Sequence, residues 1–309
     1  MKKFHIFLLV FMMICVTACS DSTSTSSAEP SSNTSASSEA EYVLKLSHGY
    51  PNTHYMHTFM EWFDEKIQER SDGRLALEIY PNAQLVSIDQ QMAAMLQGQI
   101  EMSHIASPVL AGFDPRWNFF ELPFLFDYDP DDPTVYLQNR NKFLEDERGG
   151  GEFKRFMEEK GVKVLSLGYV DLFGSIFTTE KVVTDIKSAE GLRIRTPGGI
   201  ISPETMSSVG INGITMAGTE VITGLQQGVV DGLLTTPIYA HDVRLPIKTY
   251  SVLPLFGSVT SVAISLEKFE SLPPDLQNIL LETGAELEQH IHETIAQAGE
   301  EVYAKLEED

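Results

Sequence analysis

The stretch GLRIRTPGG, Gly191 to Gly199, predicts a short strand from Leu192 to Thr196 that ends at a proline and two glycines. Side chains alternate along a strand, so Arg193 and Arg195 share one face. A guanidinium at the end of a buried strand can hold a carboxylate in two-point geometry. Arg195 is therefore the candidate ligand-binding cation. The alternative is that it is solvated, as most strand arginines are.

A second segment, TEVITGLQQGVVDG, follows from Thr219 to Gly232. It predicts a helix that is capped at Thr219, carries Glu220 in its first turn and stops at Gly228. A tight turn at Asp231-Gly232 is expected to follow.

The order and spacing of these two segments resemble the central block of the solute-binding proteins of tripartite ATP-independent periplasmic (TRAP) transporters, the C4-dicarboxylate-binding (DctP) type. That family typically has G-L-K-I-R-V-P and then E-V-Y-T-A-L-Q-T-G-V-V-D-G. The resemblance continues upstream and covers roughly residues 42 to 300. It includes LKLSHGYPNTHYMH (Leu44 to His57), SDGRLALEIYPNAQL (Ser71 to Leu85) and LPFLFD (Leu122 to Asp127).

The resemblance implies an α/β fold like that of type II periplasmic binding proteins, with two lobes, a hinge and a long C-terminal helix that spans both lobes. Lobe I is expected to comprise residues 41–168 with part of 257–285. Lobe II is expected to comprise residues 169–256 with part of 286–309.

Hydrophobic periodicity independently favours a parallel α/β architecture. Residues 43–47 alternate as a strand, and a helix entered through Asn52 and Thr53 follows. A second strand and a second helix come next, at 75–79 and 88–96. From Pro274 an apolar stripe runs for about 30 residues, which corresponds to a helix of roughly 45 Å. The apolar positions of the first helix are Met56, Phe59, Met60, Phe63 and Ile67.

The N-terminus has the features of a secretory signal. Lys2 and Lys3 precede an apolar stretch from Phe4 to Val16 that is too short to span a bilayer. Small residues ending at Cys19 are typical of lipoprotein processing, so residues 1–18 would be removed and the Cys19 thiol acylated. The alternative is an ordinary signal that happens to precede a cysteine. Residues 19–40 are mostly Ser, Thr and Ala and predict a flexible tether to the membrane.

Composition excludes several classes of function. The only cysteines are Cys15 and Cys19, so the folded body has no thiol for a disulfide, a nucleophile or a metal site. The formal charge is −22, and removal of Lys2 and Lys3 makes it −24. This charge argues against binding to nucleic acid or to anionic lipid surfaces. An anionic ligand would then need a local cation, which again points to Arg195.

The chain departs from the family at three positions. Ser175 stands close to the place of an auxiliary arginine, Gly218 replaces an aromatic residue, and Thr235 replaces an asparagine. These changes predict a roomier and less charged pocket, so sialic acid and simple dicarboxylates are not carried over as ligands. Replacement contacts could come from Thr236, Tyr239 or His241, or from Tyr169 or Phe173, although such residues are more often packing than contact.

Histidines near the first helix allow three interpretations. His54, His57 and Glu61 recur at helical spacing, with His48 just upstream. They could hold a metal, lie at the helix start or the surface, or supply a ligand contact from His48 or His54. No HExxH motif is present. No metal and no cofactor are expected.

The sequence contains no G-x-S-x-G motif, no Walker A motif and no G-x-G-x-x-G that opens a helix. The protein is therefore expected not to be an enzyme. We expect a lipid-anchored extracytoplasmic receptor, in the periplasm or at the cell surface, that delivers a small organic acid to a TRAP permease. The alternatives are a secreted enzyme acting on small organic acids and a sensory ligand-binding module.

Overall fold

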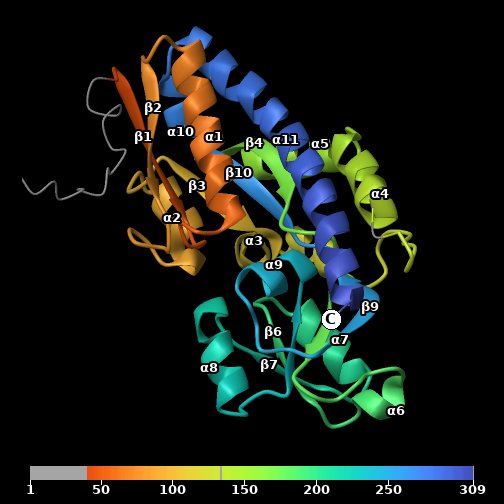
Figure 1. Ribbon diagram of the computed structural model, residues 1–309. Coiled ribbons are helices and arrows are strands. Elements are labelled where there is room, and N and C mark those ends of the chain that lie inside the picture. The colour runs from red at the N-terminus through yellow and green to blue at the C-terminus, as the bar shows by residue number, and fades with distance from the viewer. Residues whose placement is uncertain (1–39, 133, 309) are drawn as a thin grey trace, which may run out of the picture. The chain divides into compact units, whose positions relative to one another are not determined.

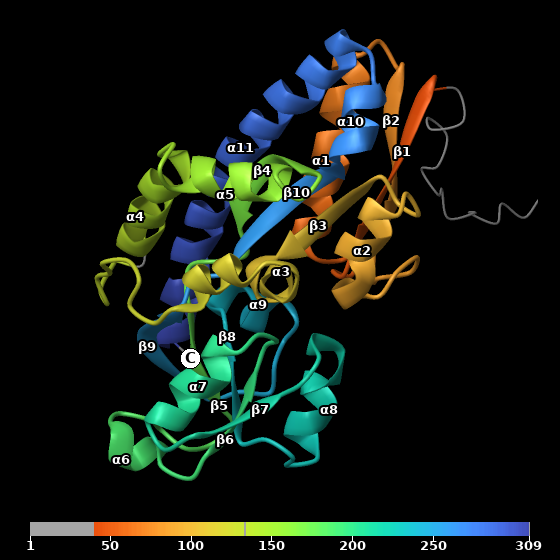
Figure 2. The ribbon, with the colours of Figure 1, turned by 180° about the vertical axis from the view of Figure 1, so that it is seen from behind.

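The computed structural model describes residues 40–132 and 134–308. The predicted signal segment 1–18, Cys19 and all of the tether except residue 40 lie outside the described residues. The described chain folds into two five-stranded sheets with helices packed on them (Figures 1 and 2). We call each sheet with its helices a lobe.

The first sheet contains three parallel strands and one antiparallel strand that joins them to a fifth. Its order in space is β2 (Leu75–Tyr80), β1 (Tyr42–His48), β3 (Met102–Ala106), β10 (Val259–Ser265) and β4 (Val162–Tyr169). Strand β10 runs antiparallel to both of its neighbours and is buried along its whole length. A strand buried on both faces must be continuously apolar or small, which explains its sequence VTSVAIS.

The second sheet repeats this arrangement. Its order is β7 (Asn212–Thr215), β6 (Arg193–Thr196), β8 (Gly232–Thr235), β5 (Gly174–Thr178) and β9 (Thr249–Phe256). Strands β7, β6 and β8 are parallel, and β5 is antiparallel to β8 and β9. In each sheet, the fourth strand, which is antiparallel to both of its neighbours, is the one that the chain forms directly after crossing from the other sheet.

The chain crosses between the sheets through residues 170–173 and again through residues 257–258. Arg140, which is fully buried, ties the two crossings together. Its Nη2 donates to the Asp171 carbonyl at 2.5 Å and its Nη1 to the Ser258 carbonyl at 3.4 Å. Its guanidinium also lies 4.2 Å from the centre of the Tyr169 ring. These contacts hold the two connecting segments side by side, which is the geometry of a two-stranded hinge.

Fourteen helical segments, including three short 3₁₀ segments, occur in the described residues. In chain order they are α1 (Tyr55–Arg70), η1 (Ile88–Gln90), α2 (Gln91–Leu96), α3 (Ser107–Phe113), η2 (Pro115–Glu121), α4 (Thr134–Glu145), α5 (Gly150–Glu158), α6 (Ile186–Ala189), α7 (Ile201–Ser208), η3 (Gly218–Glu220), α8 (Val221–Gln226), α9 (Pro237–Asp242), α10 (Leu266–Ser271) and α11 (Pro274–Glu308).

Helices α1 and α11 pack together over one face of the first sheet, and α2 and α3 cover the other (Figures 1 and 2). The predicted apolar stripe of α1 is confirmed, because all five of its residues are buried. Helix α11 has 35 residues, about 52 Å at 1.5 Å per residue. It contacts β4 in the first lobe and α9 next to the second sheet, and Leu306 packs against core residues of both lobes.

Three local predictions were wrong. His54, rather than Asn52 or Thr53, caps α1, because its ring Nδ1 accepts the Met56 N–H at 3.1 Å. The segment that starts near Thr219 is first a 3₁₀ turn, and α8 begins only at Val221 without a side-chain cap. Asp231-Gly232 is not a tight turn, because Gly232 opens β8 while Asp231 pairs with Arg193.

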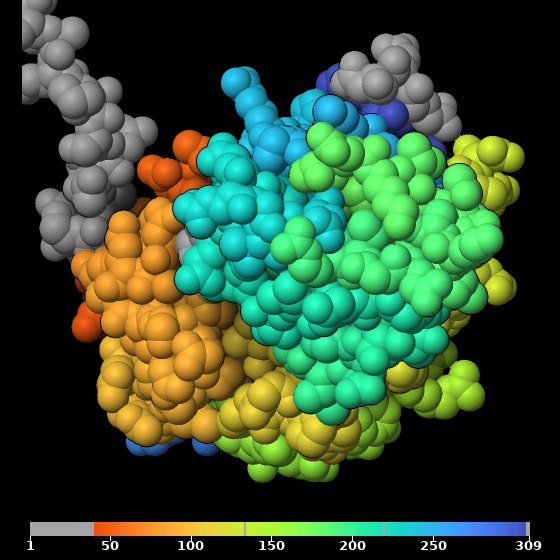
Figure 3. Space-filling view, turned by 90° about the horizontal axis from the view of Figure 1, so that it is seen from below, coloured from red at the N-terminus to blue at the C-terminus, as the bar shows by residue number. Residues whose placement is uncertain are grey.

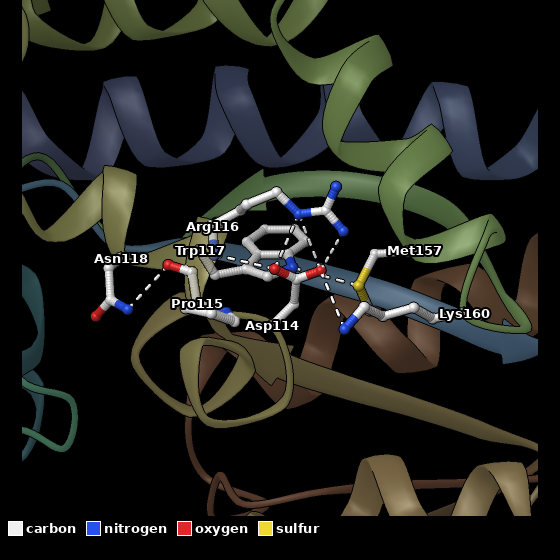
Figure 4. Close-up of polar contacts among 7 residues, drawn as sticks. All are labelled: Asp114, Pro115, Arg116, Trp117, Asn118, Met157 and Lys160. Atoms are coloured by element: carbon white, nitrogen blue, oxygen red, sulfur yellow. Dashed lines mark hydrogen bonds and ion pairs between the residues drawn. The ribbon is translucent and has the colours of Figure 1, made fainter.

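A buried carboxylate begins the η2 segment that precedes the LPFLFD motif (Figure 4). Asp114 accepts the Arg116 backbone N–H at 3.0 Å and the Arg116 Nη2 at 2.5 Å, and Lys160 Nζ lies 3.4 Å away. The indole N–H of Trp117 donates to the sulfur of Met157 at 3.2 Å. The hydrogen bonds from Arg116 lower the pKa of Asp114 to about 2.

We expect Asp114→Asn to reduce the free energy of unfolding by about 1–2 kcal/mol at pH 7. The folded-state pKa of Asp114 is depressed, so its contribution is present above about pH 4 and disappears as the pH falls towards 2. Urea unfolding of both proteins at several pH values measures the difference. Asp146→Asn is the matched control, because Asp146 makes the same Asp-x-Arg contact on the surface. Equal losses in the two variants would contradict the assigned role.

Candidate ligand-binding site

The candidate site lies where the parallel strands of the second sheet end. Strands β6, β7 and β8 finish at Thr196, Thr215 and Thr235, and α/β proteins bind ligands outside the carboxyl ends of parallel strands. In Figure 3 the teal surface of residues near 220 adjoins the orange surface before residue 100 along a narrow seam.

Arg195 is the central charge of this site. Its side chain leaves β6 on the face of Leu233 and Phe177, and only 8% of the residue is exposed. Its Nε donates to the Met216 carbonyl at 3.0 Å. Burial lowers its pKa to about 10, so it remains a cation at neutral pH. Among residues 40–132 and 134–308, no carboxylate forms an ion pair with it.

The other arginine of the strand is different. Arg193 is paired with Asp231, with Nη2 and Oδ1 2.5 Å apart, and its side chain is 42% exposed. The two arginines therefore share a face of β6, as the alternation predicted, but only Arg195 is buried without a described counter-charge.

Tyr239 on α9 lies next to Arg195. The electrostatic effect of its phenol raises the pKa of Arg195 and so opposes the effect of burial. Its hydroxyl oxygen is 3.7 Å from the position that a Cβ at Gly218 would occupy. Tyr239 thus approaches, from another element, the place where the family has an aromatic residue. The predicted residues Arg195, Gly218 and Tyr239 are brought together.

A buried carboxylate holds α9 in position. Asp171, in the first crossing, accepts the Tyr239 N–H at 3.0 Å and the Leu172 N–H at 2.7 Å. The Thr236 side chain also bonds to it. Burial raises the pKa of Asp171 to about 7. Asp171 was not among the predicted site residues, although a lone aspartate between two apolar strands, in GYVDLFG, was an available signal.

His48 is committed to contacts within the protein. Its Nδ1 accepts the Tyr50 backbone N–H at 3.2 Å, so the proton of the neutral ring is on Nε2. Nε2 then donates to Nδ1 of His57 at 3.0 Å, and His57 in turn lies 3.5 Å from Glu61. Burial lowers the pKa of His48 to about 4. These bonds favour a positioning role, and a direct ligand contact from His48 stays a prediction.

Other predicted positions are used mainly for structure. The Ser175 hydroxyl donates to the Ser251 carbonyl and accepts the Leu253 N–H at 3.2 Å, which aligns β5 with β9. Tyr169 donates from the first lobe to Asn141, and its hydroxyl lies 2.9 Å from His292. Thr235 is buried at the end of β8, directly opposite Ser175, and Thr236 is the N-cap of α9. Ligand contacts from these four residues stay predictions.

The structure places His104 and Tyr50 beside His54, for which a ligand contact was one of the predicted alternatives. The His54 ring is centred 5.9 Å from that of Tyr239, and Tyr50 stacks on His54 at 5.1 Å. His104 on β3 is centred 5.6 Å from Tyr50. His104 was not predicted as a site residue, although a histidine inside the apolar strand MSHIA indicates a buried polar group. Within the described chain, no group of three or more His, Cys, Asp or Glu side chains is arranged to hold a metal ion.

Two α/β lobes joined by a double crossing, with a buried cation at the strand ends, define a periplasmic-type binding protein. The family profile of bacterial extracellular solute-binding proteins, family 7 (DctP), matches residues 46–309. The chain belongs to this family, whose members are binding proteins. The predicted family, the two-lobed α/β class and the long C-terminal helix are thereby confirmed.

Relatives with known names agree. The chain is 26% identical over 282 residues to the 2,3-diketo-L-gulonate-binding periplasmic protein YiaO of Escherichia coli, covering 88% of this chain and 80% of the relative. A TRAP periplasmic solute-binding protein of Haemophilus influenzae with bound L-gulonate is 25% identical, with a TM-score of 0.76 over 87% of this chain and 85% of that one. A Sulfurospirillum deleyianum protein with bound succinate has a TM-score of 0.74 at 23% identity, over 87% and 84%. In the part of this chain that the structure describes, no helix is long and apolar enough to cross a membrane.

We expect Asp171→Asn to change how stability depends on pH. The folded-state pKa is raised, so the contribution of Asp171 is complete below about pH 4 and is lost as the pH rises through 7. Asparagine mimics the protonated form at every pH. Relative to the variant, the native protein should lose a few kcal/mol, on the order of 3, between pH 4 and 8.

Urea unfolding across this range tests the expectation. Glu121, whose pKa burial also raises to about 7, is present in both proteins, so its contribution cancels from the difference. Asp242→Asn, at the last residue of the same helix but 38% exposed at its side chain, is the control. A pH-independent difference between Asp171→Asn and the native protein would refute the prediction.

Proposed function

We propose that this chain is a lipid-anchored extracytoplasmic receptor that binds a small organic acid at Arg195 and delivers it to the membrane permease of a TRAP transporter. The observation that carries the proposal is the burial of Arg195 without a counter-ion among the described residues. The family membership and the bound acids of its relatives support the same function.

A buried and unpaired guanidinium is unfavourable until an anion reaches it. Nε of Arg195 already donates to the Met216 carbonyl. The two Nη groups therefore remain to donate in parallel to a carboxylate. Lys154 shows the contrast, because Glu288 already pairs with it at 2.5 Å. Since the chain is strongly acidic, this local attraction has to overcome long-range repulsion of an anion.

Ligand capture would close the lobes about the two crossings. Arg195 belongs to the second sheet, whereas His54 and His104 belong to the first lobe. A ligand that contacts both sides stabilises the closed form by its differential affinity. We propose the lobe boundaries given above, 41–168 with part of 257–285 and 169–256 with part of 286–309, with the signal at 1–18 and the lipid-anchored tether at 19–40.

Arg195→Ala should weaken binding of the acid by about 2–5 kcal/mol, thirty- to several-thousandfold, because it leaves the carboxylate in a poorly solvated site. Arg195→Lys should restore only part of the affinity, since it keeps the charge and loses the fork. Arg193→Ala is the control and should have little effect. A thermal-shift screen of small carboxylates identifies the acid, and calorimetry on the variants measures the loss. A larger loss at Arg193 than at Arg195 would refute this site.

Cys19→Ser should release the protein from membranes without changing its fold, because Cys19 is the only cysteine of the predicted mature chain. Membrane fractionation at high salt and circular dichroism measure the two properties. If the variant stays in the membrane fraction, the lipoprotein assignment is wrong.

A further inference from the structure

His54 has a buried hydrogen-bond donor without a described acceptor. Its Nδ1 accepts the Met56 N–H, so the neutral ring carries its proton on Nε2. Nε2 is buried and has no partner among residues 40–132 and 134–308. An unmet buried donor costs free energy, so this N–H has a strong preference for a bound oxygen atom.

The donor lies on the same site as Arg195 but belongs to the other lobe. The His54 ring is centred 5.9 Å from Tyr239, which adjoins Arg195. Tyr50 and Tyr55 flank the ring, with centres 5.1 and 4.2 Å away, and so fix its orientation.

His104 adds a second set of unmet polar atoms. The residue is 1% exposed, and neither of its ring nitrogens has a partner in the described chain. It is paired in register with His48 on the neighbouring strand, and Tyr50 lies between it and His54. A neutral imidazole provides one donor and one acceptor. Hydroxyl groups can bond to either ring nitrogen, because a hydroxyl both donates and accepts, whereas a carboxylate can only accept.

Charges on this side of the site disfavour a second anion. Burial lowers the pKa of His54 to about 4 and holds that of His104 well below its usual value, so both rings are neutral at pH 7. The carboxylate of Asp242 acts on the His54 ring. A second ligand carboxylate on this side would therefore meet neutral rings and a nearby like charge.

We propose that the ligand is a polyhydroxylated monocarboxylic acid, with its carboxylate on Arg195 and its hydroxyl groups on His54 and His104. This inference rests on the proposed function and narrows it, because a simple dicarboxylate would leave the imidazoles unmatched. The relatives' bound ligands include both sugar acids and succinate, so resemblance alone does not choose between the two classes.

Calorimetry with a matched panel tests the ligand class. The hydroxylated probes are gluconate, L-gulonate, glucuronate and galacturonate. Hexanoate has the same chain length without hydroxyl groups, and adipate and succinate are the dicarboxylates. At least one hydroxylated probe should bind about 100-fold or more tighter than hexanoate, adipate or succinate.

His54→Asn is the decisive variant. Asparagine keeps an oxygen that can cap α1 and removes the ring N–H. The variant should lower the affinity for the hydroxylated acid about 5- to 150-fold and leave the affinity for hexanoate unchanged. His104→Phe should have the same direction of effect. His290→Asn, at a ring that stacks on Trp62, should have none.

The two proposals fail differently. If a dicarboxylate binds tightest and requires Arg195, or if His54→Asn weakens all probes equally, the hydroxy-acid inference is overturned and the receptor function stands. If no carboxylate binds in a manner that depends on Arg195, the proposed function itself is overturned.

Discussion

The desolvated charge of Arg195 is the constraint on which the rest of the site depends. Arg195 is only 8% exposed and has no described counter-ion, so its charge would be more stable in water. The fold must therefore hold the side chain in its buried position. Strand β6 holds its backbone between β7 and β8, and the Met216 carbonyl fixes its Nε. Under the proposed function, a bound anion would recover the free energy lost by burying this charge.

Two other buried ionisable groups, Arg140 and Asp171, lie at the segments that connect the lobes. Arg140 stabilises two crossing segments by donating to carbonyls rather than to a carboxylate, so it joins them without an ion pair. Asp171, in the first crossing, accepts the backbone N–H of Tyr239 on α9 and that of its neighbour Leu172.

In the proposed site, the two lobes would contribute different chemistry. The second sheet would provide the charge, and the first lobe would provide neutral rings with defined donors and acceptors. The His48–His57–Glu61 chain orders the β1 end of the first lobe, since each ring nitrogen in it has an assigned role. Such a site discriminates mainly against competing ligands, because they leave buried polar atoms of the protein without hydrogen-bond partners. Additional contacts to the preferred ligand contribute less to specificity.

The sequence by itself determined the elements whose signals are local. Alternation placed Arg193 and Arg195 on one face of a strand, periodicity located α1 and α11, and motif order identified the family. Only the tertiary structure decided which arginine is buried, because that depends on Asp231 pairing with one of them across the sheet. It also decided that His104 lies beside Tyr50, a contact between a strand and a loop that are far apart in the chain. Burial and pairing are sums over such distant neighbours, and no local pattern records them.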